Sequence, residues 1–251
     1  MAEAGNPRLS YGVLLYPGFE VLDVAGPIEC LNTLTDQLPN SKLTLAVIGR
    51  PIDANNPHIP ADLSPANPRN GPPFTANPTD GFSFQSSQVY KPSHTFETAP
   101  PLDVLIIGGG WGSFPLEAIQ PEIDFLKKVF PSLQNLFTVC TGSAIAAHAG
   151  LLDGLRATSN KANWELVTPC GPRTHWVAQA RWVTSGKIWT SSGVSAGIDG
   201  MMAFIGEAYP EEQYPGLLER IANNMEYRYE PDPSNDPFAK IFNVKDVLPQ
   251  E

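Results

Sequence analysis

The chain has 251 residues, 42% of them hydrophobic, and its formal net charge at pH 7 is −10. This length and apolar content suit one sizeable α/β domain with a full core. The acidic balance argues against nucleic acid and anionic membranes as partners, because phosphate groups are bound by basic surfaces and no Lys/Arg patch occurs in the sequence.

The first predicted elements are a strand, a helix and a second strand. The apolar run at 9–17 alternates too little for a solvent-facing strand and predicts a buried parallel one. A helix is expected over about 20–34, with Pro27 in its first turns, where proline is tolerated. Residues 43–48 predict the next strand.

The composition changes abruptly to Pro, Asn and Ser over residues 50–101. Closely spaced prolines exclude a long helix, so we expect a surface loop or a partly mobile insertion over about 50–80. Short edge strands are expected at 82–84 and 88–90.

Alternating strands and helices resume after this insertion, and they predict an α/β fold with a mostly parallel sheet. A strand that ends at a cysteine is central to this half of the chain and is treated below. The other expected elements are a strand at 104–107, helices at 121–133 and 160–167, a hairpin at 181–190, helices at 195–208 and 211–227, and an irregular extension from about 230.

The cysteines have no metal-site or disulfide pattern. Cys30, Cys140 and Cys170 form an odd set without CxxC or cysteine–histidine spacing, so we expect neither a disulfide framework nor a metal site. No run of ~18 apolar residues and no secretory signal is found. These features favour a cytoplasmic protein without membrane contact.

The segment around Cys140 is the most informative part of the chain. An apolar run at 136–139 ends at this cysteine, and a helical stretch of small residues begins directly after it. A thiol on such a strand–turn–helix, or nucleophile elbow, projects from the sheet, and the helix N-terminus is expected to lower its pKa. The alternative is a buried core cysteine, which is common at the end of a strand.

Two other strand ends carry groups suited to a site. Glycines 108–110 and then Trp111 follow the strand at 104–107, while Asp23 and its alternative Glu20 follow the first strand. Glycine amides can approach a substrate closely, and aromatic side chains often line small-molecule clefts. The carboxyl ends of parallel strands meet at one crevice, so we expect these groups near Cys140.

Five ordered motifs give the chain a family resemblance. They are Asp23-Val-Ala-Gly-Pro27, the run that ends in Gly108-Gly109-Gly110, Val139-Cys140-Thr141-Gly142, the run that ends in Ala157-Thr158, and the run that ends in Gly197-Ile198-Asp199. With them the chain resembles the ThiJ/PfpI group of the class I glutamine-amidotransferase-like superfamily, nearest to its isonitrile hydratase branch. The resemblance covers most of residues 9–208. It implies a single flavodoxin-like α/β sandwich over 1–251, with helices on both faces of the sheet, that forms a homodimer and uses no cofactor.

The same resemblance assigns roles by position. Cys140 would be the nucleophile and Asp23 its acidic partner. The amides of Gly110 and Thr141 would stabilise an anion, and the Thr141 hydroxyl could contact the substrate. Apart from the resemblance, the glycine turn and aromatic side chain suggest that Gly109 and Trp111 also line a small-molecule site. Residue 141 is Thr, whereas superfamily proteases and amidotransferases pair the nucleophile with a histidine. The four histidines of the chain lie elsewhere, at His58, His94, His148 and His175.

These groups favour a small electrophile as substrate. A carboxyl held against a thiol in an apolar crevice should have a raised pKa, so it can donate a proton near neutrality. The preferred interpretation is a cysteine-dependent hydratase or lyase that converts an isonitrile and water to an N-substituted formamide. The alternatives are a glyoxalase-type or biosynthetic lyase, and a non-catalytic redox or stress sensor that uses Cys140.

Overall fold

The computed structural model describes residues 9–53, 55–65, 88–114 and 116–250. Its centre is a seven-stranded sheet in the order β3-β2-β1-β4-β5-β9-β8. All neighbouring strands are parallel except the β8–β9 pair. The strands are β1 (Ser10–Leu14), β2 (Thr44–Gly49), β3 (His94–Thr95), β4 (Val104–Ile107), β5 (Asn135–Val139), β8 (Trp182–Ser185) and β9 (Ile188–Ser191).

The central strands are buried on both faces. Every residue of β4 and β5 is buried, as expected for parallel strands covered by helices on both sides. Val13 of β1 aligns with Ile106 of β4, which in turn aligns with Phe137 of β5. This continuous apolar layer forms the centre of the core and fixes where the neighbouring strands end.

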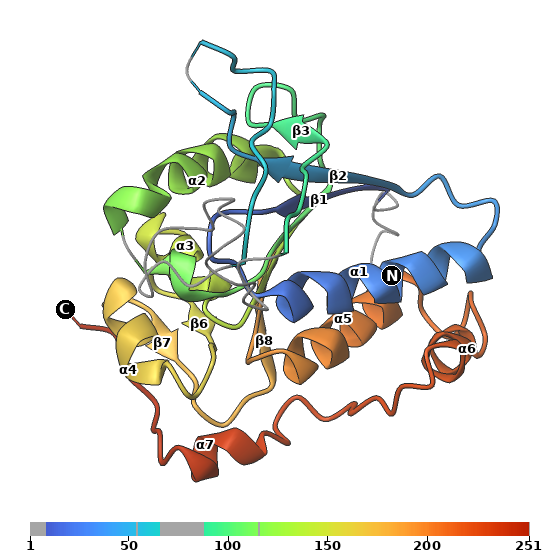
Figure 1. The fold of residues 1–251 in the computed structure, drawn as a ribbon. Coiled ribbons are helices and arrows are strands. Elements are labelled where there is room, and N and C mark those ends of the chain that lie inside the picture. The colour runs from blue at the N-terminus through green and yellow to red at the C-terminus, as the bar shows by residue number, and fades with distance from the viewer. Residues whose placement is uncertain (1–8, 54, 66–87, 115, 251) are drawn as a thin grey trace, which may run out of the picture.

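Helices cover both faces of the sheet, as the crossover direction requires. From β1 the chain moves outward to β2 through α1 (Val21–Gln37), whereas from β4 it moves the other way to β5 through α2 (Leu116–Val129). Because parallel crossovers are right-handed, these two helices lie on opposite faces. Figure 1 shows α1 beside α5 (Ser195–Ala208), and α2 with α3 (Gly142–His148) on the other side of the strands.

A small lobe and the C-terminal tail complete the fold. The lobe contains a two-stranded parallel sheet of β6 and β7, and the tail crosses it, with Trp176 and Val247 exchanging two backbone hydrogen bonds. The remaining elements are η2 (Trp111–Ser113), η3 (Phe130–Ser132), β6 (Arg156–Ala157), α4 (Trp164–Val167), η4 (Thr168–Cys170), β7 (His175–Trp176), α6 (Leu217–Asn224) and α7 (Pro237–Ile241).

The predicted α/β architecture is confirmed, and several boundaries are corrected. The hairpin at 181–190 is present as β8 and β9, and the strand at 104–107 is β4. The helix expected at 121–133 begins earlier, at Leu116, and accommodates Pro121 inside it at the cost of one helical hydrogen bond.

The C-terminal predictions need larger corrections. The helix expected at 211–227 contains only α6, because turns occupy the residues on either side of it. The extension beyond 230 is not wholly irregular, since it contains α7, whose N-terminus is capped by Asp236. The expected edge strand at 82–84 lies outside the described residues, and Tyr90 contributes only an isolated antiparallel bridge to Leu63. Among the helices that the structure describes, none is long and apolar enough to span a bilayer.

Candidate active site

Cys140 occupies the turn between β5 and α3. Its backbone φ is +58°, a left-handed conformation that costs roughly 1–2 kcal/mol for a residue with a side chain. The surrounding chain holds this conformation. The Cys140 amide donates to the carbonyls of Ser191 and Ser192, and its carbonyl accepts from the hydroxyls of Ser143 and Ser159 at 3.1 and 2.9 Å. The side chain is therefore presented at the carboxyl edge of the sheet, with 8% of the residue exposed.

Asp23 lies against this thiol from the first turn of α1. It is fully buried, and its carboxylate accepts hydrogen bonds from the amides of Gly109 at 3.0 Å and Val194 at 3.2 Å. A further hydrogen bond joins the carboxyl to the Cys140 thiol. Among the described residues, no cationic side chain forms an ion pair with Asp23.

Burial without a cation raises the pKa of Asp23 to about 7. The nearby negative charge of Glu20 acts in the same direction, whereas the Gly109 amide opposes it. The raised pKa predicted from the sequence is thus confirmed. Glu20 itself is exposed at the N-terminus of α1, so Asp23 is the carboxyl in direct contact with the thiol.

The pKa of the Cys140 thiol is raised, which corrects the expectation that α3 would lower it. Burial is the main cause, and the Asp23 charge is the second. The Thr141 amide donates to the sulfur and favours the thiolate, but this one contact does not offset desolvation by the surrounding protein. Ionisation of this thiol near neutral pH would therefore require an adjacent base, and the Asp23 carboxyl is the titratable group in contact with it.

The glycine turn after β4 packs directly on the elbow. A Cβ at Gly109 would lie 2.6 Å from the Thr141 amide, and Gly110 has a φ of +130°, so both positions require glycine. The Gly110 amide donates to Thr141 Oγ1 at 2.8 Å, and Ser113 Oγ donates to the same oxygen at 3.0 Å. The Gly109 and Gly110 amides therefore both have partners within the protein. The anion-stabilising role expected for the Gly110 and Thr141 amides stays a prediction.

Trp111 lies next to the glycine turn, whereas the described histidines form no hydrogen bond with Cys140. Trp111 is half-buried directly after the glycine turn and packs near Phe114, with ring centroids 5.8 Å apart. His148 is half-buried at the end of α3, where desolvation lowers its pKa. His175 lies 3.5 Å from the carboxylate of Asp246 in the tail. Among the described residues, no histidine contributes to the hydrogen bonds of Cys140 given above.

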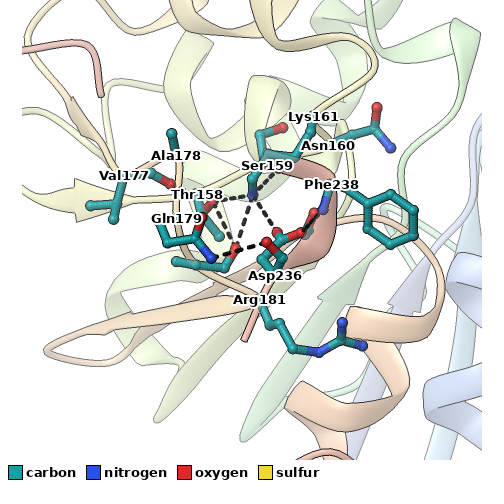
Figure 2. A network of polar contacts seen from close by, with 12 residues as sticks. Thr158, Ser159, Asn160, Lys161, Val177, Ala178, Gln179, Arg181, Asp236 and Phe238 are labelled. Carbon is teal, nitrogen blue, oxygen red and sulfur yellow. Dashed lines mark hydrogen bonds and ion pairs between the residues drawn. The ribbon is translucent and has the colours of Figure 1, made fainter. Parts of the chain in front are cut away.

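A buried network beside the elbow was not foreseen from the sequence. The Lys161 ammonium donates to Thr158 Oγ1 at 2.8 Å and to the Ser159 and Ala180 carbonyls at 3.0 and 2.9 Å, and it pairs with Asp236 at 3.0 Å (Figure 2). Desolvation lowers the pKa of Lys161 to about 8. No sequence pattern links residues 161 and 236, because only the path of the tail brings them together.

The family follows from comparisons with known proteins. A model of the DJ-1/PfpI family matches residues 81–207. The chain is 30% identical over 191 residues to isonitrile hydratase of Pseudomonas putida, a match that covers 76% of this chain and 68% of that protein. The chain belongs to the DJ-1/PfpI family. Its resemblance to the ThiJ/PfpI group is thereby confirmed.

The proteins similar to this chain also include a transcriptional regulator. The chain is 27% identical over 237 residues to the HTH-type transcriptional regulator GbdR of Pseudomonas aeruginosa, which covers 90% of this chain but 55% of the regulator. The fold is shared with the crystal structure of a ThiJ/PfpI family protein from Pseudomonas syringae, at a TM-score of 0.62 and 24% identity over 91% of this chain and 77% of that one. Because a regulator is among the relatives, the charge-based exclusion of nucleic acid has no support from the comparisons.

Proposed function

We propose that this DJ-1/PfpI protein is a cysteine-dependent hydratase that converts an isonitrile and water to an N-substituted formamide. The observation that carries the proposal is the buried, hydrogen-bonded pair of Cys140 and Asp23, in which the pKa of the carboxyl is about 7. The similarity to isonitrile hydratase supports the choice of substrate. We include a homodimer without cofactor and a cytoplasmic location in the proposal, as the family resemblance and the sequence suggest.

The first step uses the pair as a carrier of one proton. Near pH 7 the carboxylate of Asp23 accepts the thiol proton while the Cys140 sulfur attacks the terminal carbon of the isonitrile. The carboxyl then gives this proton to the same carbon. The product is a thioimidate, in which carbon bears the sulfur, one hydrogen and a double bond to nitrogen, and no external acid is consumed.

The second step is hydrolysis of this intermediate. Water adds to the carbon–nitrogen double bond, and its two protons end on the nitrogen and, after the carbon–sulfur bond breaks, on the Cys140 sulfur. The formamide leaves and the free thiol is restored. Asp23 is placed to relay these protons, because its carboxyl contacts the sulfur directly.

Peptide hydrolysis is disfavoured by the same geometry. An amine leaving group needs a general acid–base relay of the kind that a histidine provides. None of the hydrogen bonds of Cys140 among the described residues involves a histidine. Rearrangement of an α-oxoaldehyde to a hydroxy acid needs a comparable proton shuttle, so we rank it below hydration.

The test compares the wild-type protein with Cys140→Ala and Cys170→Ala. Each protein is incubated with an aryl isonitrile and, separately, with methylglyoxal, and formamide or lactate is quantified. We expect formamide from wild type and Cys170→Ala, because Cys170 lies apart in η4 and contacts the Leu166 carbonyl. Cys140→Ala should give only the uncatalysed background. Formamide at background level from wild type would overturn the hydratase proposal, and lactate would replace it with the glyoxalase-type reaction.

A ligand sensor is the second candidate, and the similarity to GbdR favours it. Binding without turnover distinguishes this function. If an aryl isonitrile or another small electrophile raises the melting temperature of wild type progressively, with the logarithm of its concentration, while no product forms, the sensor is favoured. Product formation at a rate that depends on Cys140 excludes a purely sensing role.

A further inference from the structure

Residues 158–161 form a wall of the Cys140 site that the proposed mechanism has not yet used. This segment follows β6 and is tied to the elbow, because Ser159 Oγ donates to the Cys140 carbonyl at 2.9 Å. Ser143 of α3 donates to Ser159 Oγ at 2.8 Å. A movement of this segment would therefore be transmitted to the backbone that carries the thiol.

Asn160 presents an amide donor from this wall. Its Oδ1 accepts the Asn163 backbone amide at 2.9 Å and the Asn163 side-chain amide at 3.0 Å. Because a backbone N–H can only donate, this contact fixes which end of the Asn160 amide is oxygen. Among the described residues, no acceptor has a hydrogen bond with Asn160 Nδ2.

The free donor and the thiol face the same small residue. A Cβ at Gly193 would lie 2.7 Å from Asn160 Nδ2 and 4.0 Å from Cys140 Sγ. Next to this glycine, the Val194 amide holds Asp23 Oδ1. Asp23, Cys140 and Asn160 are thus all arranged around the loop that joins β9 to α5, and a side chain at position 193 would collide with the Asn160 amide.

A buried ion pair holds Asn160 in this place. Its neighbour Lys161 is 2% exposed and is bound by three oxygens and by the Asp236 carboxylate. In Figure 2 the Asn160 side chain extends away from this network, although the two residues are adjacent in sequence. The Lys161–Asp236 pair anchors the backbone next to Asn160. The Asn160 side chain takes no part in that network, so its Nδ2 is available to another partner.

We propose that Asn160 is a further catalytic residue, whose Nδ2 donates a hydrogen bond to the substrate nitrogen after Cys140 has attacked, and that Lys161 and Asp236 position it. The inference rests on the proposed hydratase function. In a free isonitrile the nitrogen lone pair is used in bonding to the terminal carbon. In the thioimidate the nitrogen has regained that lone pair and can accept a hydrogen bond, so the donor acts only once the reaction is under way.

The chemical consequence is confined to the second step. A hydrogen bond to the imine nitrogen draws electrons from the carbon and accelerates addition of water. Asn160 forms and breaks no covalent bond, and the nitrogen receives its proton through Asp23 or water. A substrate of this class needs a nitrogen bonded to the attacked carbon, as isonitriles have.

The test separates the two steps with Asn160→Asp and Asn160→Leu. Asn160→Asp keeps an oxygen for Asn163 and replaces only the donor, whereas Asn160→Leu removes the donor without adding charge. Turnover of an aryl isonitrile is followed together with the intact mass of the protein. Asn224→Asp, at an exposed position of α6, is the charge-matched control.

We expect kcat to fall by roughly 10²–10³-fold in both Asn160 variants with KM unchanged or lower, as for the loss of one hydrogen-bond donor in a transition state. An adduct with the mass of one isonitrile should accumulate on Cys140. Lys161→Met should show a smaller accumulation of the same adduct, since it loosens the wall and leaves the donor present. Asn224→Asp should match wild type.

Three outcomes would overturn the proposal. Turnover by both Asn160 variants within twofold of wild type means that the donor is not used. Reduced turnover without adduct means that Asn160 acts before or during attack by sulfur, which is not the role proposed. If wild type forms no formamide, the hydratase function fails first and this role fails with it, whereas the first two outcomes leave the hydratase function intact.

Discussion

Two buried pairs of titratable groups lie at the same end of this molecule and have opposite character. In one, Asp23 contacts Cys140 and has no ion-pair partner in the part of the chain that the structure describes. In the other, Asp236 is paired with Lys161, whose ammonium also binds three oxygens. Both carboxylates are nearly inaccessible, at 0% and 2% exposure. The difference between them is therefore the partner and not the depth of burial.

This difference in partner decides whether a buried carboxyl can exchange a proton or mainly holds the fold together. A buried carboxylate with a cation keeps its charge, and removal of either member leaves the other charge unpaired in a low-dielectric interior. A buried carboxylate without a cation has a raised pKa and exchanges its proton near neutral pH, which a catalytic acid–base group requires. We expect the first pair to act directly in turnover, and the second to control mainly stability, with a smaller effect on turnover through the position of Asn160.

The largest effect is expected from Asp23→Asn. Loss of the proton carrier should lower isonitrile turnover by about 10²–10⁴-fold. The free energy of unfolding should change by less than about 2 kcal/mol, because the amide removes a buried charge and this offsets the loss of one hydrogen bond. Alkylation of Cys140 by iodoacetamide should stay measurable. Burial, the main cause of the raised thiol pKa, is unchanged, and loss of the Asp23 charge, the second cause, compensates for loss of the base.

The matched control is Asp36→Asn on the exposed side of the same helix, which should leave turnover and stability unchanged. Equal turnover in wild type and Asp23→Asn would remove this carboxyl from the mechanism. A loss of activity accompanied by global unfolding would mean that the Asp23 pair is architectural, and the contrast between the two pairs would disappear.

Lys161→Met should affect stability far more than Asp23→Asn does, and turnover far less. Asp236 would remain buried without a cation, and the free energy of unfolding should fall by about 3–5 kcal/mol. The double variant Lys161→Met with Asp236→Leu should recover much of this loss, because both charges are then removed together. Denaturant unfolding monitored by circular dichroism measures all three proteins.

Arg173→Met provides the control for this comparison. Arg173 also pairs with an aspartate, Asp153, but its side chain is 68% exposed, so the cost should stay below about 1 kcal/mol. If Lys161→Met costs no more than Arg173→Met, the buried pair does not stabilise the fold as argued here.

The same contrast explains what the sequence could predict. Cys140, Asp23 and the glycine turn each follow a buried strand, and the carboxyl ends of neighbouring parallel strands must lie together. Local patterns therefore suffice to place them in one crevice. The choice of Asp23 over Glu20 as the partner of Cys140 came from the family resemblance, whereas the raised pKa of a carboxyl beside the thiol followed from this reasoning.

The other pair depends on long-range packing that no local pattern encodes. Asp236 reaches Lys161 only because the tail crosses the small lobe, where Trp176 and Val247 form a β-bridge and the Trp164 indole donates to the chain at Lys245. The partners of the glycine amides were unpredictable for the same reason. Burial also reversed the expected pKa shift of the thiol, since sequence indicates a helix N-terminus but not the degree of desolvation around it.

The dependence of turnover on pH tests whether a single ionisation, that of Asp23, controls the reaction of the Asp23–Cys140 pair. The pKa of Asp23 is about 7, so below this pH the carboxyl is protonated and cannot accept the thiol proton. We expect kcat/KM to rise about tenfold per pH unit up to pH 7 and then to level off, with the plateau extending into the alkaline range because the thiol pKa is raised. Steady-state rates in wild type measure the profile, and Asp23→Asn should lack the acidic limb. A limb that persists unchanged in Asp23→Asn would assign it to another group.

The smallest predicted effect concerns Glu20, the exposed carboxylate at the N-terminus of α1. Its negative charge contributes to the raised pKa of both Asp23 and Cys140, but it acts through solvent, which screens the interaction. Glu20→Gln should therefore move the acidic limb of the profile downward by only a few tenths of a pH unit. The shift should shrink in 0.5 M salt, where the Debye length falls below about 5 Å.

Glu219→Gln, on α6, is the control and should leave the limb unchanged. An upward shift in Glu20→Gln, or a downward shift that salt does not reduce, would contradict a through-solvent charge effect. A shift as large as one pH unit would mean that Glu20 contacts the pair directly, and the proton would then be shared among three groups. The small, salt-sensitive response is expected only if burial without a cation sets the pKa of Asp23 and the exposed charge merely adjusts it.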